Sequence, residues 1–477
     1  MIHEIFNQAI FVYAITICGV FLLLLAIALI EMNSYMKKNF FVDYKYILSS
    51  PFAPSVSLVA PAYNEGMTII DNVKSLLSLS YNNNEIIIVN DGSKDDTMAK
   101  LIEAFDLVPV PYAWEPVLET AAVRKIYKSR NRAFRKLLVV DKENGGKADA
   151  LNAGLNLSQK ELVACIDVDC IIESDALLKM VKPFMEDHTV IGSGGVVRIA
   201  NSCVIEEGRL VEVRLPEKLL PRFQVLEYIR AFLLGRLAWS RLNGLLLISG
   251  AFGMFKREVA LSAGGYNPNT VGEDMELVVR MRRTMREQKK PYRVAYIPDP
   301  LCWTEAPSTN QVLGRQRNRW TRGMAETLWT HRALLFNPKY GRMGLISYPY
   351  WLFYEWLSPI MEFLGLTYLL FRALTGGVNW DYFFTLVLVI YSFSFFVSMI
   401  ALLAEQLSFY RYTKRKDTLK MIFLALIEPV WYHPRLVWWS LRGNFDLIRG
   451  KRHWGNMVRQ GFRKHMEEKM QPEGAMP

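Results

Sequence analysis

The uncharged apolar run at residues 10–30 constrains this chain more than any other feature of its sequence. Its 21 residues include no charged side chain, and a helix of that length crosses a hydrocarbon core of roughly 30 Å at about 1.5 Å per residue. A cleaved signal peptide is the alternative, but the run is too long for one and no basic segment precedes it. We therefore expect a retained membrane anchor, in keeping with a composition that is 51% hydrophobic.

The charges that flank this helix predict its orientation. Lys37, Lys38 and Lys45 follow it, whereas only His3 and Glu4 precede it, and an excess of Lys and Arg marks the cytoplasmic side. We expect a multi-pass protein of the inner (plasma) membrane whose large middle region is cytoplasmic. The five cysteines form no CxxC pair, which suits a reducing compartment and argues against structural zinc.

Further long apolar stretches lie toward the C-terminus, at residues 345–370 and 382–403. The link between them is poor in charge and the link that follows is basic, which predicts an outward helix and then an inward one. The last stretch, residues 421–441, is interrupted by prolines and charged residues, so we expect a bent or re-entrant segment there.

These features predict five regions along the chain. They are an N-terminal transmembrane helix (1–35), a cytoplasmic domain (36–307), amphipathic interface helices (308–343), a C-terminal transmembrane region (344–441) and a basic cytoplasmic tail (442–477).

The middle region has the pattern of an α/β domain. The runs in "SVSLVAPAYNE", "NEIIIVNDGS" and "ELVACIDVDC" are each followed by a segment of helical period, which predicts buried parallel strands joined by crossover helices. Ligands of such sheets bind beyond the carboxyl ends of the strands. Those ends carry Asn64 and Glu65, then Asp91, then Asp167 and Asp169. We therefore expect these five side chains at one rim of the sheet.

The "DVDC" and "GGKADALN" segments predict a metal and diphosphate site. Residues two apart at a strand end face the same way, so Asp167 and Asp169 can offer two carboxylates to one Mg²⁺ or Mn²⁺. Two aspartates in this spacing can also form a solvent-exposed acidic turn that binds no metal, and this is the alternative interpretation if the motif is considered without its neighbours. Lys147, however, stands in a glycine-bordered turn at the head of a predicted helix, a position that suits a diphosphate.

The segment "GED" opens another predicted helix with Glu273 and Asp274. Acidic residues are favoured at a helix start by capping and by the helix dipole, so a purely structural role is one interpretation. A carboxylate general base is the other, and the two are compatible because a helix start fixes the position of the side chain.

Residues 314–323, "GRQRNRWTRG", combine four arginines with one tryptophan. A helix that begins near Ser308 or Thr309 places three arginines on one face and a Gln and a Trp on the adjacent face. These are Arg315, Arg319 and Arg322, then Gln316 and Trp320. An interfacial helix whose arginines meet anionic lipid is the alternative. Arginine contacts with a diphosphate and tryptophan stacking on a sugar ring would explain both faces.

Together, "PAYNE", "VNDGSKDDT", "GGKADALN", "DVDC", "SGAFG", "GED" and "QRNRW" resemble the membrane-integrated family 2 glycosyltransferases of GT-A (Rossmann-like) fold. This group includes the synthases of cellulose, hyaluronan, chitin and poly-N-acetylglucosamine. The resemblance covers about residues 56–331, with every segment in family order. It implies a hexosyltransferase that inverts the anomeric centre and displaces a nucleoside diphosphate in one step, with Mg²⁺ or Mn²⁺ as cofactor.

The resemblance also implies roles for the motif residues. Asp274 would be the general base and Asp169 the metal ligand, while Gly250 and Trp320 would contact the acceptor. The nucleotide sugar would be bound by Asn64, Glu65, Asp91, Lys147, Asp167, Gln316 and Arg319.

By this resemblance, the expected function is polymerisation of a β-linked exopolysaccharide, of the kind found in biofilms, and its passage across the membrane. A UDP-sugar would be the donor, with UDP-N-acetylglucosamine favoured over UDP-glucose, and the growing glycan would be the acceptor. The alternative is a transferase that adds one or a few sugars to a lipid carrier or a short oligosaccharide. The lipid bilayer is a further partner, a small membrane subunit is left open, and no nucleic acid is expected.

Overall fold

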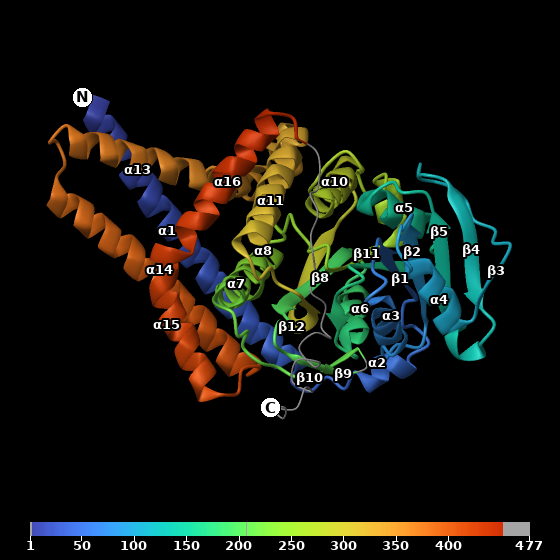
Figure 1. Cartoon of the computed structure of the whole chain (residues 1–477). Helices are drawn as coiled ribbons and strands as arrows, with labels where there is room; N and C mark the ends of the chain where they lie inside the picture. Colours follow the sequence, from blue (N-terminus) through green and yellow to red (C-terminus); the bar gives the residue numbers. More distant parts are fainter. Residues whose placement is uncertain (1, 207, 452–477) are drawn as a thin grey trace, which may run out of the picture.

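The computed structural model describes residues 2–206 and 208–451 (Figure 1). The predicted tail therefore lies in large part outside the described residues. A 10-stranded sheet forms the centre of the α/β domain, in the order β3-β4-β5-β2-β1-β6-β11-β8-β12-β7. The strands are β1 Val56–Ala62, β2 Asn84–Asp91, β3 Leu107–Pro109, β4 Val123–Ser129, β5 Leu137–Lys142, β6 Leu162–Ile166, β7 Ile171–Ile172, β8 Val190–Ile199, β11 Phe252–Lys256 and β12 Arg293–Thr304. A small second sheet pairs β9 Val204–Glu206 with β10 Arg209–Glu212.

The three strands predicted from the sequence are neighbours. Strand β1 lies between β2 and β6 and is parallel to both, with Val56 in register with Asn84 on one side and Leu162 on the other. The expectation of buried parallel strands is confirmed for these three. Four other strands of the sheet, β3, β4, β7 and β11, run antiparallel to a neighbour. Strands β4 and β5 are joined by a link too short for a parallel crossover, so they can pair only in the antiparallel sense.

Helices cover the sheet, and α5 packs across β1 and β2 while α6 packs on β8 and β12. A π-helical segment, Ile229–Gly235, joins α7 to α8. The helices of this part of the chain are α2 Lys45–Ser49, α3 Ile69–Leu77, α4 Thr97–Phe105, α5 Lys147–Leu157, α6 Ala176–Glu186, α7 Leu219–Tyr228, α8 Arg236–Arg241, α9 Arg257–Ser262, α10 Glu273–Glu287 and α11 Asn310–Thr330.

Within the described residues, two helices are long and apolar enough to cross a membrane. They are Phe6–Asn39, within α1 Ile2–Asn39, and α14 Trp380–Ser408. A third span results if Met343–Trp356 and α13 Ser358–Leu374 form one broken crossing, bent by 40°. The helix predicted at 345–370 is therefore divided. Pro359, in the first turn of α13, has no backbone N–H to continue the preceding helix, which accounts for the break.

The final apolar stretch is also interrupted, as its prolines predict. A single residue, Tyr432, separates α15 Arg415–Trp431 from α16 His433–Ile448. Pro434 lies in the first turn of α16. The path of this stretch relative to a membrane stays a prediction.

The long helices pack directly on the α/β domain. The second half of α1 buries Leu24, Ala28 and Met32 in the same core as the sheet. A buried ion pair between Arg198 of β8 and Glu405 of α14 joins the sheet to the far end of that helix. In Figure 1 the long helices extend from one side of the domain, and β3 and β4 form its opposite edge.

Candidate active site

The polar residue at the end of β1 ties together two neighbouring strand ends. Asn64 adopts a left-handed backbone with φ of 55°, which asparagine tolerates better than most residues. Its backbone N–H donates to Ser93 Oγ at 2.9 Å, and its side-chain oxygen accepts from the Lys94 N–H at 2.8 Å. Glu65 follows, and its N–H donates to Thr97 Oγ1 at 2.9 Å. The "PAYNE" and "NDGSKDDT" segments are thus joined, as their shared rim predicts.

Asp91, at the end of β2, is buried and supports the loop that carries Lys147. One carboxylate oxygen accepts from Lys142 Nζ at 2.7 Å and from the Gly145 N–H at 3.0 Å, and the other accepts from the Gly146 N–H at 2.8 Å. Gly146 has a φ of 89°, a conformation that favours glycine. The visible role of Asp91 is to hold this turn, and its predicted contact with the nucleoside stays a prediction.

Lys147 begins α5 and lies between two acidic segments. Its ammonium is 2.5 Å from Asp167 Oδ1 and 3.7 Å from Glu273 Oε1. Burial lowers the pKa of Lys147, but the charges of Asp167 and Glu273 outweigh it and the pKa is raised. Burial also raises the pKa of Glu273 against the opposing influence of Lys147. Lys147 is therefore a fixed positive charge at the predicted diphosphate position.

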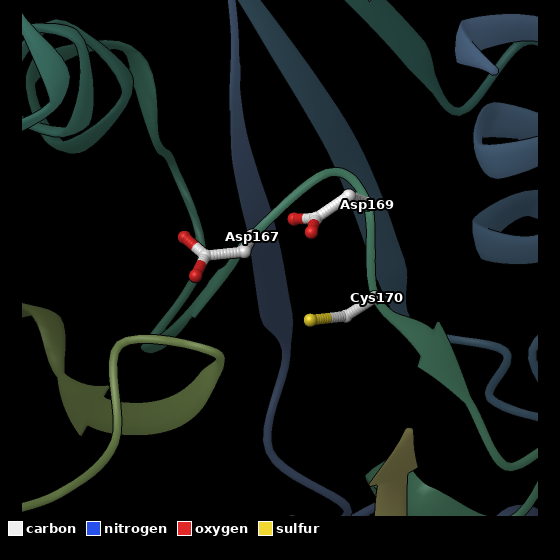
Figure 2. A group of neighbouring side chains, drawn as sticks. All are labelled: Asp167, Asp169 and Cys170. Carbon is white, nitrogen blue, oxygen red and sulfur yellow. The ribbon is translucent and has the colours of Figure 1, made fainter. Parts of the chain in front are cut away.

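Asp167, Asp169 and Cys170 form a compact group after β6 (Figure 2), with ligand atoms within 4.8 Å of one another. The Cys170 thiol hydrogen-bonds with Cys302, and this bond and burial raise its pKa well above the usual value. The thiol is therefore protonated near neutral pH, and the two carboxylates are the charged donors. Their oxygens fit a hard divalent cation such as Mg²⁺ or Mn²⁺.

Asp274, in the first turn of α10, is held by two backbone N–H groups. Gly250 N–H donates to Oδ2 at 3.0 Å, and Met275 N–H donates to Oδ1 at 3.0 Å. A methyl group added to Gly250 would lie 3.1 Å from Lys147 Nζ and 3.3 Å from Asp274 Oδ2. Gly250 therefore lies directly between these two charged groups, and its lack of a side chain leaves room there.

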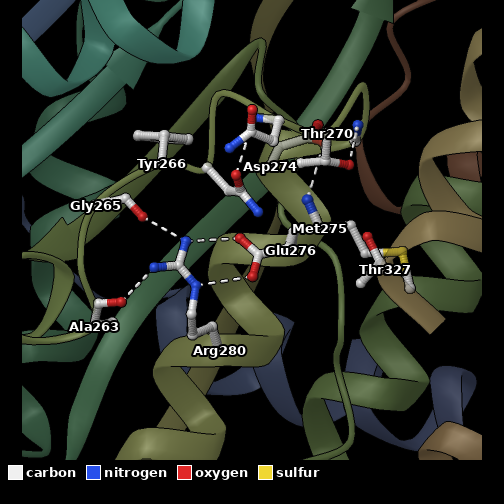
Figure 3. Close-up of polar contacts among 12 residues, drawn as sticks. Ala263, Gly265, Tyr266, Thr270, Asp274, Met275, Glu276, Arg280 and Thr327 are labelled. Atoms are coloured by element: carbon white, nitrogen blue, oxygen red, sulfur yellow. Dashed lines mark hydrogen bonds and ion pairs between the residues drawn. The ribbon is translucent and has the colours of Figure 1, made fainter. Parts of the chain in front are cut away.

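The first turns of α10 are fixed by an ion-paired arginine (Figure 3). Both guanidinium contacts between Arg280 and Glu276 are short, at 2.8 and 2.7 Å. The same guanidinium donates to the carbonyls of Ala263 and Gly265. His331, which follows the last residue of α11, has its Nε2 3.2 Å from Glu276 Oε1, the same oxygen that accepts from Arg280 Nε. These contacts fix the helix that presents Asp274.

Helix α11 begins as predicted, after Thr309, whose side chain accepts a hydrogen bond from the Val312 N–H. It meets the "GED" loop through glycines. A Cβ built on Gly323 would lie 2.6 Å from Gly272 Cα, and one built on Gly272 would lie 2.7 Å from Gly323 Cα. Only two glycines allow this approach. Arg319 Nη1 also donates to the Val271 carbonyl at 3.2 Å, so the "QRNRW" helix and the start of α10 form one unit.

Two arginines of residues 314–323 are buried. Arg322 is 4% exposed and donates to Asn318 Oδ1 and the Lys451 carbonyl. Arg317 is 8% exposed and pairs with Glu227 of α7 through contacts of 2.5 and 2.9 Å. The contacts with Glu227 of α7 and with the Lys451 carbonyl hold these two side chains inside the protein, so neither can meet lipid as the interfacial alternative requires.

One face of the Trp320 ring is covered by a neighbouring arginine, and part of the residue is exposed to solvent. The Arg317 guanidinium lies 4.3 Å from its ring centroid, and 37% of the residue is exposed. The carboxylate of Glu227, which pairs with Arg317, also accepts a hydrogen bond from Tyr432 OH at 2.8 Å. The side chain of Gln316 has a buried oxygen with no hydrogen-bond partner among the described residues.

Polar and acidic groups at the carboxyl ends of β1, β2 and β6, a basic group after β5 and a carboxylate pair after β6 form the arrangement expected of a glycosyltransferase of GT-A fold. The description "Glycosyl transferase family 2" matches residues 57–114, and "Glycosyltransferase like family 2" matches residues 119–323. The chain belongs to glycosyltransferase family 2, as the motifs predict.

Several relatives carry a more specific name. The chain is 28% identical over 389 residues to a poly-beta-1,6-N-acetyl-D-glucosamine synthase of Staphylococcus epidermidis, covering 80% of each protein. It is 28% identical over 312 residues to the protein of that name from Staphylococcus aureus, covering 65% of this chain and 64% of the relative. Among solved structures, a mannosyltransferase from Pyrobaculum calidifontis in complex with GDP-Man and Mn²⁺ has a TM-score of 0.48 and 17% identity, covering 91% of this chain and 99% of the other.

The sequence analysis missed three features of this site. The sequence predicts Glu273 only as part of a helix start, yet the residue is 2% exposed and close to Lys147. The sequence marks Arg317 only as one of four arginines, and its inward position follows from the packing of α11 against other helices. No local pattern in the sequence predicts the contact between Gly272 and Gly323.

Proposed function

We propose that this membrane protein polymerises a β-linked polysaccharide from a UDP-sugar and guides the product across the membrane. UDP-N-acetylglucosamine is the favoured donor because relatives covering four fifths of the chain are named as poly-beta-1,6-N-acetyl-D-glucosamine synthases. The observation that carries the proposal is the position of Gly250, within 3.3 Å of both Lys147 and Asp274 when a methyl group is placed on it. A basic and an acidic group thus both lie next to Gly250.

The donor half of the proposed site is organised around Lys147. Its fixed positive charge, 2.5 Å from Asp167, suits the diphosphate of a nucleotide sugar. Asn64, Glu65 and Asp91 are proposed to line the nucleoside side through the two joined loops. Asp169 would hold a divalent cation, Mg²⁺ or Mn²⁺, which supplies charge neutralisation at the leaving diphosphate when it is bound.

The acceptor half is organised around Asp274. Inverting transfer needs a base on the acceptor side, and two backbone N–H groups hold this carboxylate in one orientation. We propose that Asp274 removes the proton of the acceptor hydroxyl as the new bond forms. Glu273 is a poorer candidate because it is 2% exposed and close to Lys147.

The "QRNRW" residues are proposed to close the site. Arg319 would contact the diphosphate with Gln316, and the open face of Trp320 would support the acceptor sugar beside Gly250. The covered face of Trp320 supports this assignment, because a ring held by the Arg317 guanidinium presents its other face in a fixed plane.

We further propose a multi-pass protein of the inner (plasma) membrane, with the α/β domain in the cytoplasm and the five regions 1–35, 36–307, 308–343, 344–441 and 442–477 as predicted. The excess of Lys and Arg after the first apolar run supports this orientation. The acceptor is the growing glycan and the bilayer is a partner. A small membrane subunit would add helices if a wider path is needed.

A non-processive transferase that acts on a lipid carrier or a short oligosaccharide is the second candidate. The observation that favours it is the modest membrane region, with two or up to three apolar spans among the described residues. Product length separates the two candidates.

The test uses the full chain in detergent or nanodiscs with UDP-N-acetylglucosamine, UDP-glucose and other UDP-sugars, assayed for released UDP and for product length on a gel. We expect UDP release with UDP-N-acetylglucosamine and a long product. Asp274→Asn serves as the matched inactive control. Short products only would support the second candidate, and no UDP release from any donor would refute both.

A further inference from the structure

The edge of the sheet farthest from the long helices carries a concentrated positive charge. Residues 123–136, which include β4 and the link to β5, contain no Asp or Glu. Six of its basic side chains are exposed, namely Arg124, Lys125, Lys128, Arg130, Arg132 and Arg135. We call this set the basic edge. No step of the proposed transfer uses it.

A surface hollow of about 410 Å³ opens beside the basic edge. One wall is β4 with Arg124 and Lys125, and the other is the segment that follows β3, with Pro111 and Trp114. The volume lies within the range of small-molecule sites, roughly 300–1,000 Å³. Trp114 supplies a flat aromatic surface, and the two basic residues supply positive charge on the opposite wall.

The charges at the hollow are not neutralised by the protein. Among the residues that the structure describes, neither Arg124 nor Lys125 forms an ion pair. The pairing of β4 with β5 shifts register between Val123 and Lys125, and such bulges redirect a side chain. Arg124 is the residue at this irregularity. Two exposed cations beside an aromatic ring suit a ligand that combines a phosphate with a planar ring.

The position of the basic edge argues against a lipid surface as the occupant. Figure 1 places β3 and β4 on the opposite side of the domain from α13 and α14. An anionic membrane would therefore meet other parts of the protein first. A soluble anion small enough for the hollow remains as the ligand favoured by charge and by size.

The segment that borders the hollow also contacts the helix that begins with Lys147. Leu118 N–H donates to Asn156 Oδ1 at 2.9 Å, and Asn156 Nδ2 donates back to the Leu118 carbonyl at 2.8 Å. Ala121 N–H donates to Asp149 Oδ2 at 2.9 Å. Asn156 and Asp149 both belong to α5, so this segment is hydrogen-bonded to the helix that begins with Lys147.

We propose that the hollow is a second binding site, for a phosphorylated small molecule with a planar ring such as a nucleotide, and that its occupancy changes the affinity of the donor site. Arg124 and Lys125 bind the phosphate, and Trp114 stacks on the ring. The segment 115–122 links the hollow to α5. Binding at the hollow is independent of the proposed transferase function, whereas the change in donor affinity rests on it.

The binding test uses the full chain in detergent with the fluorescent nucleotide TNP-ATP, titrated in the presence of saturating UDP so that the donor site is filled. We expect a saturable fluorescence increase. Arg124→Glu and Trp114→Ala should each weaken it by about tenfold or more, on the scale of one lost charge-assisted or stacking contact. Arg132→Glu is the matched control, because it makes the same charge change on the basic edge away from the hollow.

Two results would overturn the site. One is the absence of saturable binding when UDP is present, and the other is an equal loss in Arg132→Glu and Arg124→Glu, which would indicate diffuse attraction to the whole edge. Because Arg124 is exposed, its variant tests the site even if Trp114→Ala fails to fold, which a thermal unfolding measurement detects.

The linkage test measures UDP affinity by calorimetry with and without saturating TNP-ATP. We expect the dissociation constant of UDP to change about fivefold, the lower end of usual coupling between sites, and to stay constant in Arg124→Glu. An unchanged constant in the wild type would overturn the linkage. Failure of UDP to bind at all would instead count against the proposed function.

Discussion

The contact between Gly323 of α11 and Gly272 of the "GED" loop gives a quantitative prediction for Gly323→Ala. The new methyl group would lie 2.6 Å from Gly272 Cα and 2.8 Å from Gly272 N. Both are backbone atoms that no side-chain rotation can move. The helix and the loop would have to separate by about 0.8 Å to reach an ordinary contact of 3.4 Å.

This separation acts on the catalytic geometry more than on stability. Overpacking costs about 1–3 kcal/mol, but alanine is favoured over glycine in a helix by about 1 kcal/mol, which offsets part of that cost. Asp274 and Trp320 lie on the two separated segments, and a misplacement of about 1 Å can cost a hundredfold in rate. We therefore expect turnover to fall by roughly ten- to a hundredfold, with the melting temperature changed by only a few degrees.

The assay is UDP release at saturating donor, with thermal unfolding measured on the same preparation. Gly235→Ala is the matched control, because the nearest atom to its added methyl group is the Arg230 carbonyl oxygen at 3.8 Å. Full turnover in Gly323→Ala would refute the reasoning. So would an equal loss of turnover in both variants, since glycine replacement alone would then explain the effect.

Three further predictions concern single side chains. Asp274→Asn should lower transfer by roughly a hundredfold or more through loss of the base, and calorimetry should show unchanged UDP binding; near-normal transfer would return Asp274 to a capping role. Asp169→Asn should lower turnover by orders of magnitude with folding largely kept, and undiminished activity in chelator-treated wild type would contradict this assignment. Glu227→Gln leaves the buried Arg317 without its ionic partner and should destabilise the protein by about 3–5 kcal/mol, measurable as a lower denaturant midpoint; an unchanged midpoint would show that Glu227 contributes little.

The sequence by itself determined the elements whose signals are local. The apolar run at residues 10–30 lies within α1, the three quoted strands became neighbours, and α11 began at its Thr309 cap. Periodicity, capping and strand-end polarity depend on residues a few positions apart, so one sequence suffices for them. The rim that gathers Asn64, Asp91 and Asp167 follows from the rule that ligands bind where parallel strands end.

The tertiary structure decided which charged groups are neutralised internally and which face the site. Arg317 and Glu227 are 90 residues apart in the chain, and helical spacing alone does not indicate which acidic residue Arg317 will meet. Their pairing exists because α7 and α11 pack together, where an unpaired buried charge would be costly. Gly272 and Gly323 likewise acquire their importance only when two backbones meet. Long-range packing of this kind depends on the whole fold, so no local pattern in the sequence predicts it.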